Sequence, residues 1–352
     1  MSRFATVFML TVTVVLAAHP ALAASYAVGT CKPTLPSFEN ISTAVSSVPP
    51  SSTVLVCPGT YPEQVTISQP LTLTGVAISN SAQAVITVPA GGFLTLAPDA
   101  LFGPLSPQVM VTAGPVTLTN ITVDGTGFNS GNLCSGYLVG IFYASGSSGT
   151  VNEVTTRKHF HYGCGIGILA ANETSTNESV TIQNSSFHDF DGYGINVATN
   201  QTPPTLTATI KGNTVDGGDA ASTGIATYHN AGSVTGNIVS AGVALDLVAP
   251  ASTASGKITN SGIGIVIAID GASATSNKIS KSEKGIVILA GGATVQSNTI
   301  TRATTGIEFS CNVATVAHNT IDDATVGLAD VPASFGAPNT FFNLSTIRTG
   351  GC

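Results

Sequence analysis

The stretch SNTITRATTGIEFS at 297–310 lies between SNKISKSEKGIVIL at 276–289 and AHNTIDDATVGLAD at 317–330, and all three follow one pattern. Each copy has an Asn, an Ile two residues later, and then a Gly followed by an aliphatic residue. The Asn and the Gly both recur every 21 residues, at Asn277, Asn298 and Asn319 and at Gly285, Gly306 and Gly327. A repeat in the low twenties is typical of a solenoid, whose units are too small to bury their own apolar faces and stack on one another.

The units contain short runs in which apolar and polar residues alternate, as in ATVQSN (293–298), TIT (299–301) and GIEF (306–309). Leucine-rich repeats need a fixed Leu lattice and usually helical stretches, and the units have neither. Strands this short, separated by one or two polar residues, form corners rather than hairpins. The sequence therefore predicts an all-β chain that folds as a single-stranded right-handed parallel β-helix of about ten to twelve coils.

This fold explains the Asn. A sharp corner favours left-handed backbone, which Asn and Gly tolerate best. Because coils repeat about every 4.8 Å, the Asn amides of successive coils are expected to hydrogen-bond in a ladder. The frame continues upstream with looser spacing at Asn184, Asn213 and Asn237, and Gly256 stands where the next Asn is expected.

The segment STVLVCPGTYPEQVTISQPLTLTG at 52–75 predicts the first coil, because its Val, Ile and Leu residues alternate with polar residues and would point inward. Turns are expected at 57–61 and 68–70. Before it, residues 37–48 have apolar residues at helical spacing, and Ser37 is a candidate N-cap. An open solenoid end exposes apolar core and unpaired strand edges, so we expect this helix to cap it. Residues 331–352 are expected to cap the other end.

Composition and the N-terminus indicate export. Only 8% of the 352 residues are charged, and Trp is absent. Arg3, an apolar run and the small residues of Ala21–Ala23 predict a signal peptide at 1–23, with a single β-helix domain at 24–352. A membrane anchor is the alternative, but the run is short for a membrane span. We expect a secreted or periplasmic, monomeric protein without a transmembrane segment.

Six cysteines in an exported chain predict three disulfides. The 15 possible pairings stay open, and local pairing is the working hypothesis. It joins Cys31 to Cys57, Cys134 to Cys164, and Cys311 to Cys352. A metal site is the alternative, although no Cys-x-x-Cys or Cys/His cluster has ligand spacing. We expect no cofactor and no metal.

The segment FENISTAVSSVPPSSTVLVCPGTYPEQVTISQPLTLTG at 38–75 resembles the opening of right-handed β-helix proteins of the pectin-lyase-like superfamily, which includes pectin methylesterases and NosD-type periplasmic proteins. The later Asn/Gly-Ile units resemble their generic repeats. The resemblance implies the fold, but this scaffold carries lyases, hydrolases, esterases, epimerases and binding proteins. The Arg-Pro-Trp motif of the esterases and most polygalacturonase motifs are absent, so no catalytic residue transfers.

Candidate chemistry lies where titratable residues gather before Gly in three successive units, in RKHFHYGCG (157–165), FHDFDGYG (187–194) and DGGDAASTG (216–224). Stacking in register would bring together a patch of seven candidate catalytic residues: Arg157, Lys158, His159, His161, Asp189, Asp191 and Asp219. A lyase needs a cation to neutralise a uronate and a base for the α-proton, and this patch contains both types. The alternative is that these side chains cap corner backbone or face water.

Two functions remain open from the sequence. One is an exported protein that binds or modifies a polysaccharide or cell-surface glycan through this patch, with lyase-like or epimerase-like chemistry. Four tyrosines are candidates for a sugar-stacking platform or for rim packing: Tyr143, Tyr162, Tyr193 and Tyr228. The other function is a non-catalytic structural or surface-interaction protein. The net charge of −7 argues against nucleic acid as a partner.

Overall fold

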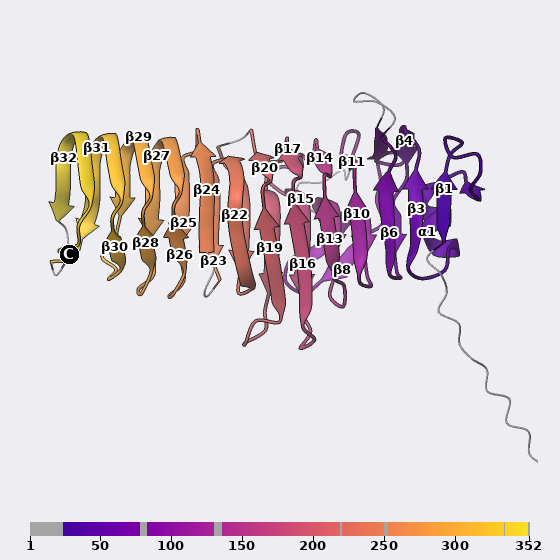
Figure 1. Ribbon diagram of the computed structural model, residues 1–352, viewed down its shortest axis with the longest axis horizontal. Coiled ribbons are helices and arrows are strands. Elements are labelled where there is room, and N and C mark those ends of the chain that lie inside the picture. Colours follow the sequence, from indigo (N-terminus) through magenta and orange to yellow (C-terminus); the bar gives the residue numbers. More distant parts are fainter. Residues whose placement is uncertain are drawn as a thin grey trace, which may run out of the picture.

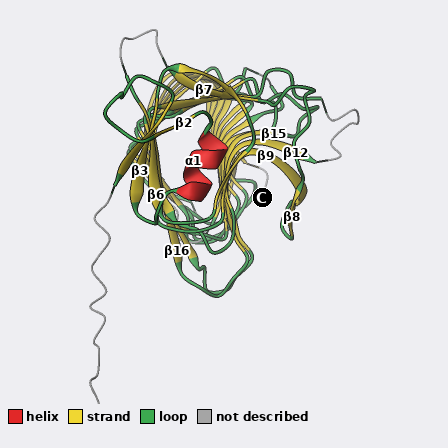
Figure 2. Ribbon diagram, turned by 90° about the vertical axis from the view of Figure 1, so that its right-hand side faces the viewer, coloured by secondary structure: helices red, strands yellow, loops and turns green. Residues whose placement is uncertain are grey.

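The computed structural model of the chain describes residues 24–77, 83–129, 136–218, 220–249, 253–333 and 335–350. It winds into successive coils whose strands pair in parallel (Figure 1). Viewed end-on, the coils form three sheets around one core (Figure 2). The structure is the parallel β-helix that the sequence predicts.

The three sheets take one strand segment each from successive coils. The first sheet contains β3 (Ser52–Val56), β6 (Leu71–Gly75), β10 (Val116–Thr119), β13 (Gly149–Asn152), β16 (Glu178–Gln183), β19 (Leu206–Lys211), the starts of β22 (Ala231–Ser240) and β24 (Thr253–Thr259), β26 (Ser273–Thr275), β28 (Thr294–Gln296) and β30 (Thr315–Ala317). The second sheet contains β4 (Gly59–Pro62), β7 (Ala84–Thr87), β11 (Ile121–Asp124), β14 (Thr155–Arg157), β17 (Ser186–His188), β20 (Thr214–Asp216), the ends of β22 and β24, and the starts of β27 (Lys278–Ile288), β29 (Thr299–Glu308), β31 (Thr320–Val331) and β32 (Thr340–Gly350). The third contains β5 (Val65–Ile67), β9 (Gly103–Val111), β12 (Tyr137–Tyr143), β15 (Gly165–Asn172), β18 (Tyr193–Thr199), β21 (Thr223–Tyr228), β23 (Val243–Val248), β25 (Ile263–Ile267) and the ends of β27, β29, β31 and β32.

The core is built by inward rows that keep one register through the coils. In the third sheet one row is aliphatic in nine successive coils and almost fully buried: Ile141, Ile168, Ile195, Ile225, Leu245, Ile265, Ile286, Ile307 and Leu328. Burial of such side chains, at about 25 cal/mol per Å² of apolar surface, stabilises the stack. Gly precedes eight of these nine aliphatic residues, and Ala244 precedes Leu245. The coils approach closely at this position, because a Cβ on Gly285 would lie 2.4 Å from the Gly306 carbonyl oxygen.

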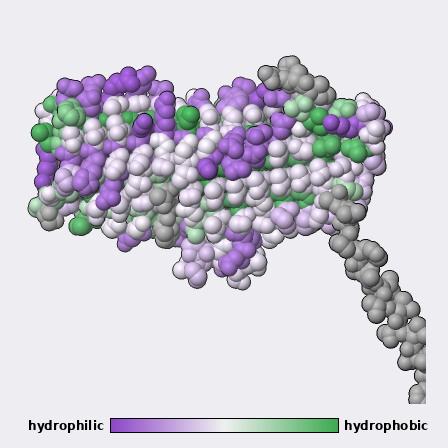
Figure 3. Space-filling model, in the orientation of Figure 1, coloured by the Kyte–Doolittle hydropathy of each residue, from purple (hydrophilic) through white to green (hydrophobic). Residues whose placement is uncertain are grey.

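The outward face of the first sheet is uniform. One register position carries Thr or Ser in eleven successive coils: Thr53, Thr72, Thr117, Thr150, Thr181, Thr209, Ser233, Thr253, Ser273, Thr294 and Thr315. Figure 3 shows the face over these strands as a mostly pale surface of intermediate hydropathy. This row contains no charged or aromatic side chain, so we looked for a functional site on the other faces.

The predicted Asn ladder is confirmed, but the left-handed backbone expected at the Asn falls on the residue before it, at Ser276, Ser297 and His318. Asn277 Nδ2 donates to Asn298 Oδ1 at 2.9 Å, and Asn298 Nδ2 donates to Asn319 Oδ1 at 2.9 Å. Asn319 continues the ladder to Asn339. Each Oδ1 also accepts the backbone N–H of the Asn in the preceding coil, so the amides hold the corners as well as one another.

The N-terminal end contains α1 (Ile41–Ser47), which lies within the opening of the coil in Figure 2. It buries Ile41, Ala44 and Val45 against the core. The N-cap is Asn40, whose side chain accepts from Thr43 N, and not Ser37 as the sequence suggested.

The start of α1 differs from the predicted range for two reasons. Ser37–Phe38 form β2, which pairs with β1 (Ser25–Val28), and the Glu63 carboxylate accepts the N–H groups of Ile41 and Ser42 at 2.8 Å. The turn expected at 57–61 also differs, because β4 begins at Gly59 and pairs with β7.

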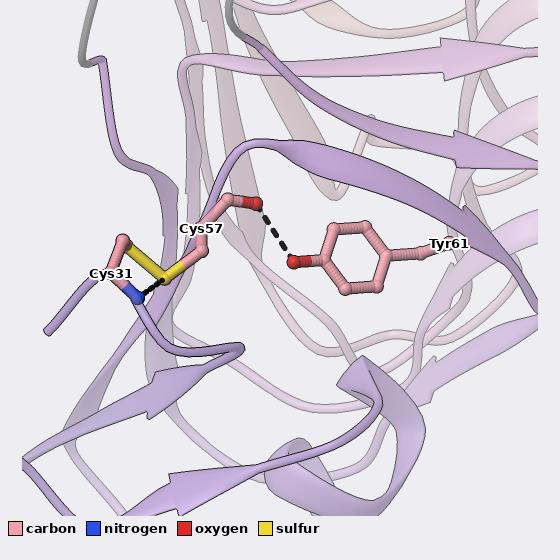
Figure 4. Close-up of a disulfide and its surroundings, with 3 residues drawn as sticks. All are labelled: Cys31, Cys57 and Tyr61. Atoms are coloured by element: carbon pink, nitrogen blue, oxygen red, sulfur yellow. Dashed lines mark hydrogen bonds between the residues drawn. A yellow bond between two sulfur atoms is a disulfide. The ribbon is translucent and has the colours of Figure 1, made fainter. Parts of the chain in front are cut away.

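The disulfide between Cys31 and Cys57 is confirmed (Figure 4). It ties the segment after β1 to the end of β3, beside the Tyr61 hydroxyl, which donates to the Cys57 carbonyl. Cys164 and Cys311 are also disulfide-bonded. Their expected partners, Cys134 and Cys352, lie outside the described residues, so both pairings stay predictions.

Candidate functional site

The predicted patch lies at the corner between the second and third sheets. Lys158 and Asp189 occupy equivalent corner positions in consecutive coils, with left-handed φ values of 61° and 58°. Lys158 Nζ lies 3.0 Å from Asp189 Oδ2, which is also 3.0 Å from His188 Nδ1. Burial acts to raise the pKa of Asp189, but the hydrogen bonds from Lys158 and His188 outweigh it and hold that pKa below its usual value. The register expected from the sequence does bring these two coils together.

Arg157 is also paired. Its Nε donates to Asp124 Oδ2 at 2.7 Å, and Asp124 accepts the hydroxyl and backbone N–H of Thr126. Burial acts to raise the pKa of Asp124, but these hydrogen bonds together lower it. Each of the two cations, Arg157 and Lys158, is therefore paired with a carboxylate of its own chain.

The histidines of the patch are enclosed. His159 is fully buried, and its Nε2 lies 2.8 Å from Gln108 Oε1. Burial lowers the pKa of His159 to about 4, which keeps the imidazole neutral. The ring fills space over Gly140, where a Cβ would lie 2.8 Å from Nε2. His161 is 5% exposed and packs edge-to-face on Phe128, and burial lowers its pKa.

Asp191 holds a loop. Its carboxylate accepts the backbone N–H groups of His161, Gly163 and Gly165 at 2.7–2.9 Å. Such a set of charge-assisted bonds fixes the backbone and occupies the oxygens that a general base would need. Asp219 lies outside the described residues. The contacts of the other six candidates favour the structural alternative for this patch.

A groove on the outer face of the third sheet offers different chemistry. Residues 97–111 form a hairpin in which β8 (Ala97–Asp99) pairs antiparallel with β9. Figure 2 shows β8 outside the stack of β9, β12 and β15. The hairpin helps to build a second apolar cluster, distinct from the core, from Leu105 and from outward residues of the third sheet: Val139, Phe142, Ile166, Leu169 and Ala171.

Two carboxyls anchor the tip of this hairpin. Glu173 Oε1 accepts the N–H groups of Ala100 and Leu101, and Asp99 Oδ1 accepts those of Leu101 and Phe102. Burial raises the pKa of Asp99, and the adjacent Glu173 raises it further. Leu101 and Phe102 are thereby held as one wall of the groove.

The groove has a volume of about 420 Å³ and opens between the hairpin tip and two coils of the third sheet. It is lined by Leu101, Phe102, Tyr193, Ala198, Thr199, Asn200, Thr202, Tyr228 and His229. This volume and this mixture of aromatic, aliphatic and hydroxyl groups are typical of a small-ligand site. A second cavity of about 480 Å³ also borders the hairpin, but none of its lining side chains is titratable.

Tyr193 and Tyr228 line one wall of the groove. The Tyr228 hydroxyl donates to Asp246 Oδ2 at 3.2 Å. Burial raises the pKa of Asp246, and burial together with Tyr193 and Asp246 raises the pKa of Tyr228 strongly. Tyr228 therefore stays protonated and acts as a donor.

Asn196 lies in the same region. Asn196 pairs in register with Leu169 in the preceding coil and with Ala226 in the next, and Ala226 pairs with Asp246, so the four share one outward row. The Asn196 side chain is 0% exposed, yet neither Nδ2 nor Oδ1 has a hydrogen-bond partner. A buried unpaired amide costs about 1–3 kcal/mol.

Few features of the sequence predict this groove. Of the four tyrosines proposed as a platform, Tyr193 and Tyr228 line it, whereas Tyr143 is buried in the core and Tyr162 is 72% exposed on a loop. Asn196 and Asp246 were missed. Both interrupt apolar strands at outward positions, in GINVAT and VALDLV, which is a signal that a sequence search could use.

Two general features bear on the chemistry. In the part of the chain that the structure describes, no group of three or more His, Cys, Asp or Glu residues could hold a metal ion. No helix among those residues is long and apolar enough to cross a membrane.

No protein-family model and no curated protein matches the sequence. Solved structures match by fold. A mannuronan C-5 epimerase A-module from Azotobacter vinelandii has a TM-score of 0.63 and 14% identity, covering 88% of this chain and 90% of that one. A complex of XylC with xylose has a TM-score of 0.62 and 10% identity, covering 92% and 86%. A GH136 lacto-N-biosidase from Eubacterium ramulus has a TM-score of 0.61 and 12% identity, covering 92% and 68%. These are right-handed parallel β-helix proteins, and this chain shares their fold.

Proposed function

We propose that the chain is an exported β-helix protein that binds a polysaccharide in the groove between the hairpin tip and the third sheet. The observation that carries the proposal is the pair of tyrosines on the wall of an open groove, Tyr193 and Tyr228, with the Tyr228 hydroxyl hydrogen-bonded to Asp246. Sugars are recognised by such polar groups beside aromatic rings, because each pyranose has both hydroxyls and an apolar C–H face.

The geometry favours binding over turnover. The raised pKa of Tyr228 makes it a poor general base, and Asp246 is the carboxylate to which its hydroxyl donates. Glycoside hydrolysis normally needs two carboxyls that flank one bond, and proton abstraction beside a uronate needs a base and a neutralising cation. The named fold neighbours act on or bind saccharides, which supports a glycan as the ligand while leaving the chemistry of this chain to its own residues.

Export is part of the proposal. It rests on the signal-peptide pattern at 1–23 and on the disulfides of the described chain. N-terminal sequencing of the protein recovered outside the cytoplasm should begin near Ala24. Retention of residues 1–23 on a membrane-bound protein would favour the anchor instead.

The function is tested by screening the purified mature chain against a panel of polysaccharides for binding and for new reducing or unsaturated ends. We expect binding without new chain ends. Tyr228→Phe removes the groove hydroxyl that donates to Asp246 and should weaken binding about tenfold. Tyr26→Phe, a matched change at the N-terminal end of the coil, should leave the affinity unchanged. Equal affinities for the two variants would refute the groove as the site.

A further inference from the structure

The charges around the groove limit what it can bind. Its lining contains no Lys or Arg. The first Lys that follows Tyr193 in its outward row is Lys284, four coils away. The residues between them in the row are Thr223, Val243 and Ile263. At about 4.8 Å per coil this is about 19 Å. Lys284 is itself paired with Glu308 at 2.6 Å.

The carboxyls lie much closer. Asp246 is hydrogen-bonded to Tyr228, and Asp99 and Glu173 meet at the hairpin tip next to Leu101. A uronate carboxylate in the groove would face these groups without a cation to offset its desolvation. A strongly cationic polymer is not favoured either, because Asp246 already accepts from Tyr228, and Asp99 and Glu173 already accept the backbone N–H groups of the hairpin tip.

The unused hydrogen-bonding capacity matches an uncharged ligand with hydroxyl groups. A carboxylate has about four acceptor positions, and Tyr228 fills one of those on Asp246. The Asn196 amide offers two N–H donors and a carbonyl acceptor, all unpaired. A sugar hydroxyl donates and accepts at once, so neighbouring hydroxyls satisfy both kinds of group.

We infer that the groove selects an uncharged glycan, whose hydroxyls pair with Tyr228 on the wall, with its partner Asp246, and with the Asn196 amide, which lies on β18 between the lining residues Tyr193 and Ala198. This rests on the proposed function. The Asn196 amide is closed to solvent, so the glycan reaches it by displacing a side chain of the groove. Asn196 is thus a specificity-determining residue kept at a cost to stability.

At Asn196 the inference predicts different effects on the melting temperature and on glycan affinity. Because the Asn196 amide has no partner in the chain, Asn196→Leu, of similar size, should leave the melting temperature unchanged or raise it. The same change should weaken binding of an uncharged glycan at least tenfold. Thr294→Ala, an outward position of the first sheet, is the matched control and should change neither quantity. A fall in melting temperature for Asn196→Leu would mean that the amide serves the fold, and would overturn its assignment.

Charge selectivity is tested by isothermal titration of the mature chain with xylan-type and glucan-type uncharged glycans, polygalacturonate and chitosan, at low and high NaCl. We expect binding to an uncharged glycan with less than a twofold change across salt, because no ion pair is screened. Asn200→Lys, at the exposed rim, should add salt-sensitive binding of polygalacturonate.

The outcomes distinguish a failure of the uncharged-glycan inference from a failure of the proposed function. If the parent binds polygalacturonate or chitosan and Tyr228→Phe abolishes that binding, the inference of an uncharged ligand is overturned and the groove stands. If no glycan binds, or if binding survives both Tyr228→Phe and Asn196→Leu, the proposed function itself fails.

Discussion

Removal of one rung of the Asn ladder should have a large and position-dependent cost. The Asn298 amide makes four hydrogen bonds: Nδ2 donates to the Ala274 carbonyl and to Asn319 Oδ1, and Oδ1 accepts the backbone N–H and Nδ2 of Asn277, all at 2.9 Å. Asn298 is 1% exposed, so water cannot replace these partners. Asn298→Ala leaves the buried backbone N–H of Asn277 without its acceptor, and we expect a loss of about 3 kcal/mol.

The comparison is made by urea denaturation of the mature, disulfide-intact chain, followed by circular dichroism. Asn339→Ala is the control, because Asn339 occupies the half-buried last rung, where water can reach the freed groups, and should cost about 1 kcal/mol. Hydrogen exchange should show faster exchange of the Asn277 amide in the Asn298 variant. If Asn298→Ala costs no more than Asn339→Ala, the ladder does not stabilise the coils in the way described.

Three further changes test other parts of the structure. Burial raises the pKa of Glu178 to about 6. The contribution of protonated Glu178 to the free energy of unfolding is therefore fully present below the unfolded pKa of 4.5 and is lost as pH rises through 6. Glu178→Gln should stabilise the chain by about 1 kcal/mol at pH 7.5 and not at pH 4, and an equal effect at both pH values would contradict this. Asp191→Ala leaves three backbone N–H groups without their acceptor and should lower the free energy of unfolding by about 2 kcal/mol, with glycan affinity retained. If stability is retained and glycan binding is lost, the predicted patch is the binding site instead. Opening the 26-residue Cys31–Cys57 loop with Cys31→Ser and Cys57→Ser should cost about 3 kcal/mol by thermal melting, and peptide mass spectrometry of the non-reduced protein should show Cys134–Cys164 and Cys311–Cys352, with free Cys352 as the contrary result.

The fold could be predicted from the sequence because its determinants are local and repeated. The 21-residue step of Asn277, Asn298 and Asn319 fixes the corner, and one corner per coil fixes the stacking. The start of α1 was predicted less well. Its first turn is bound by Glu63, a residue of the following coil, and no pattern within 37–48 reveals that contact.

The site was harder to predict, for a physical reason. In a chain with few charges, the residues that stand out are those that fix corners, and the pairing of Lys158 with Asp189 shows that charge density can mark architecture. The groove instead depends on the hairpin at 97–111, which folds over the third sheet. The sheet residues that line the groove begin only at Tyr193, far along the sequence from this hairpin. This contact is tertiary, and alternation within a strand says nothing about it.

The even spacing of the last rungs has a consequence for how such a chain can change length. Steps of 21, 21 and 20 residues join Asn277, Asn298, Asn319 and Asn339, and each rung presents the same amide to the next. A deletion or duplication of residues 298–318 therefore removes or adds one whole unit. The new junction falls at an equivalent corner, and the inward aliphatic rows stay continuous. Upstream, where the step from Asn213 to Asn237 is 24 residues, the coils are not interchangeable. The molecule thus has a part that can be lengthened or shortened in whole units, like a ruler, and a separate part whose irregular coils form the groove.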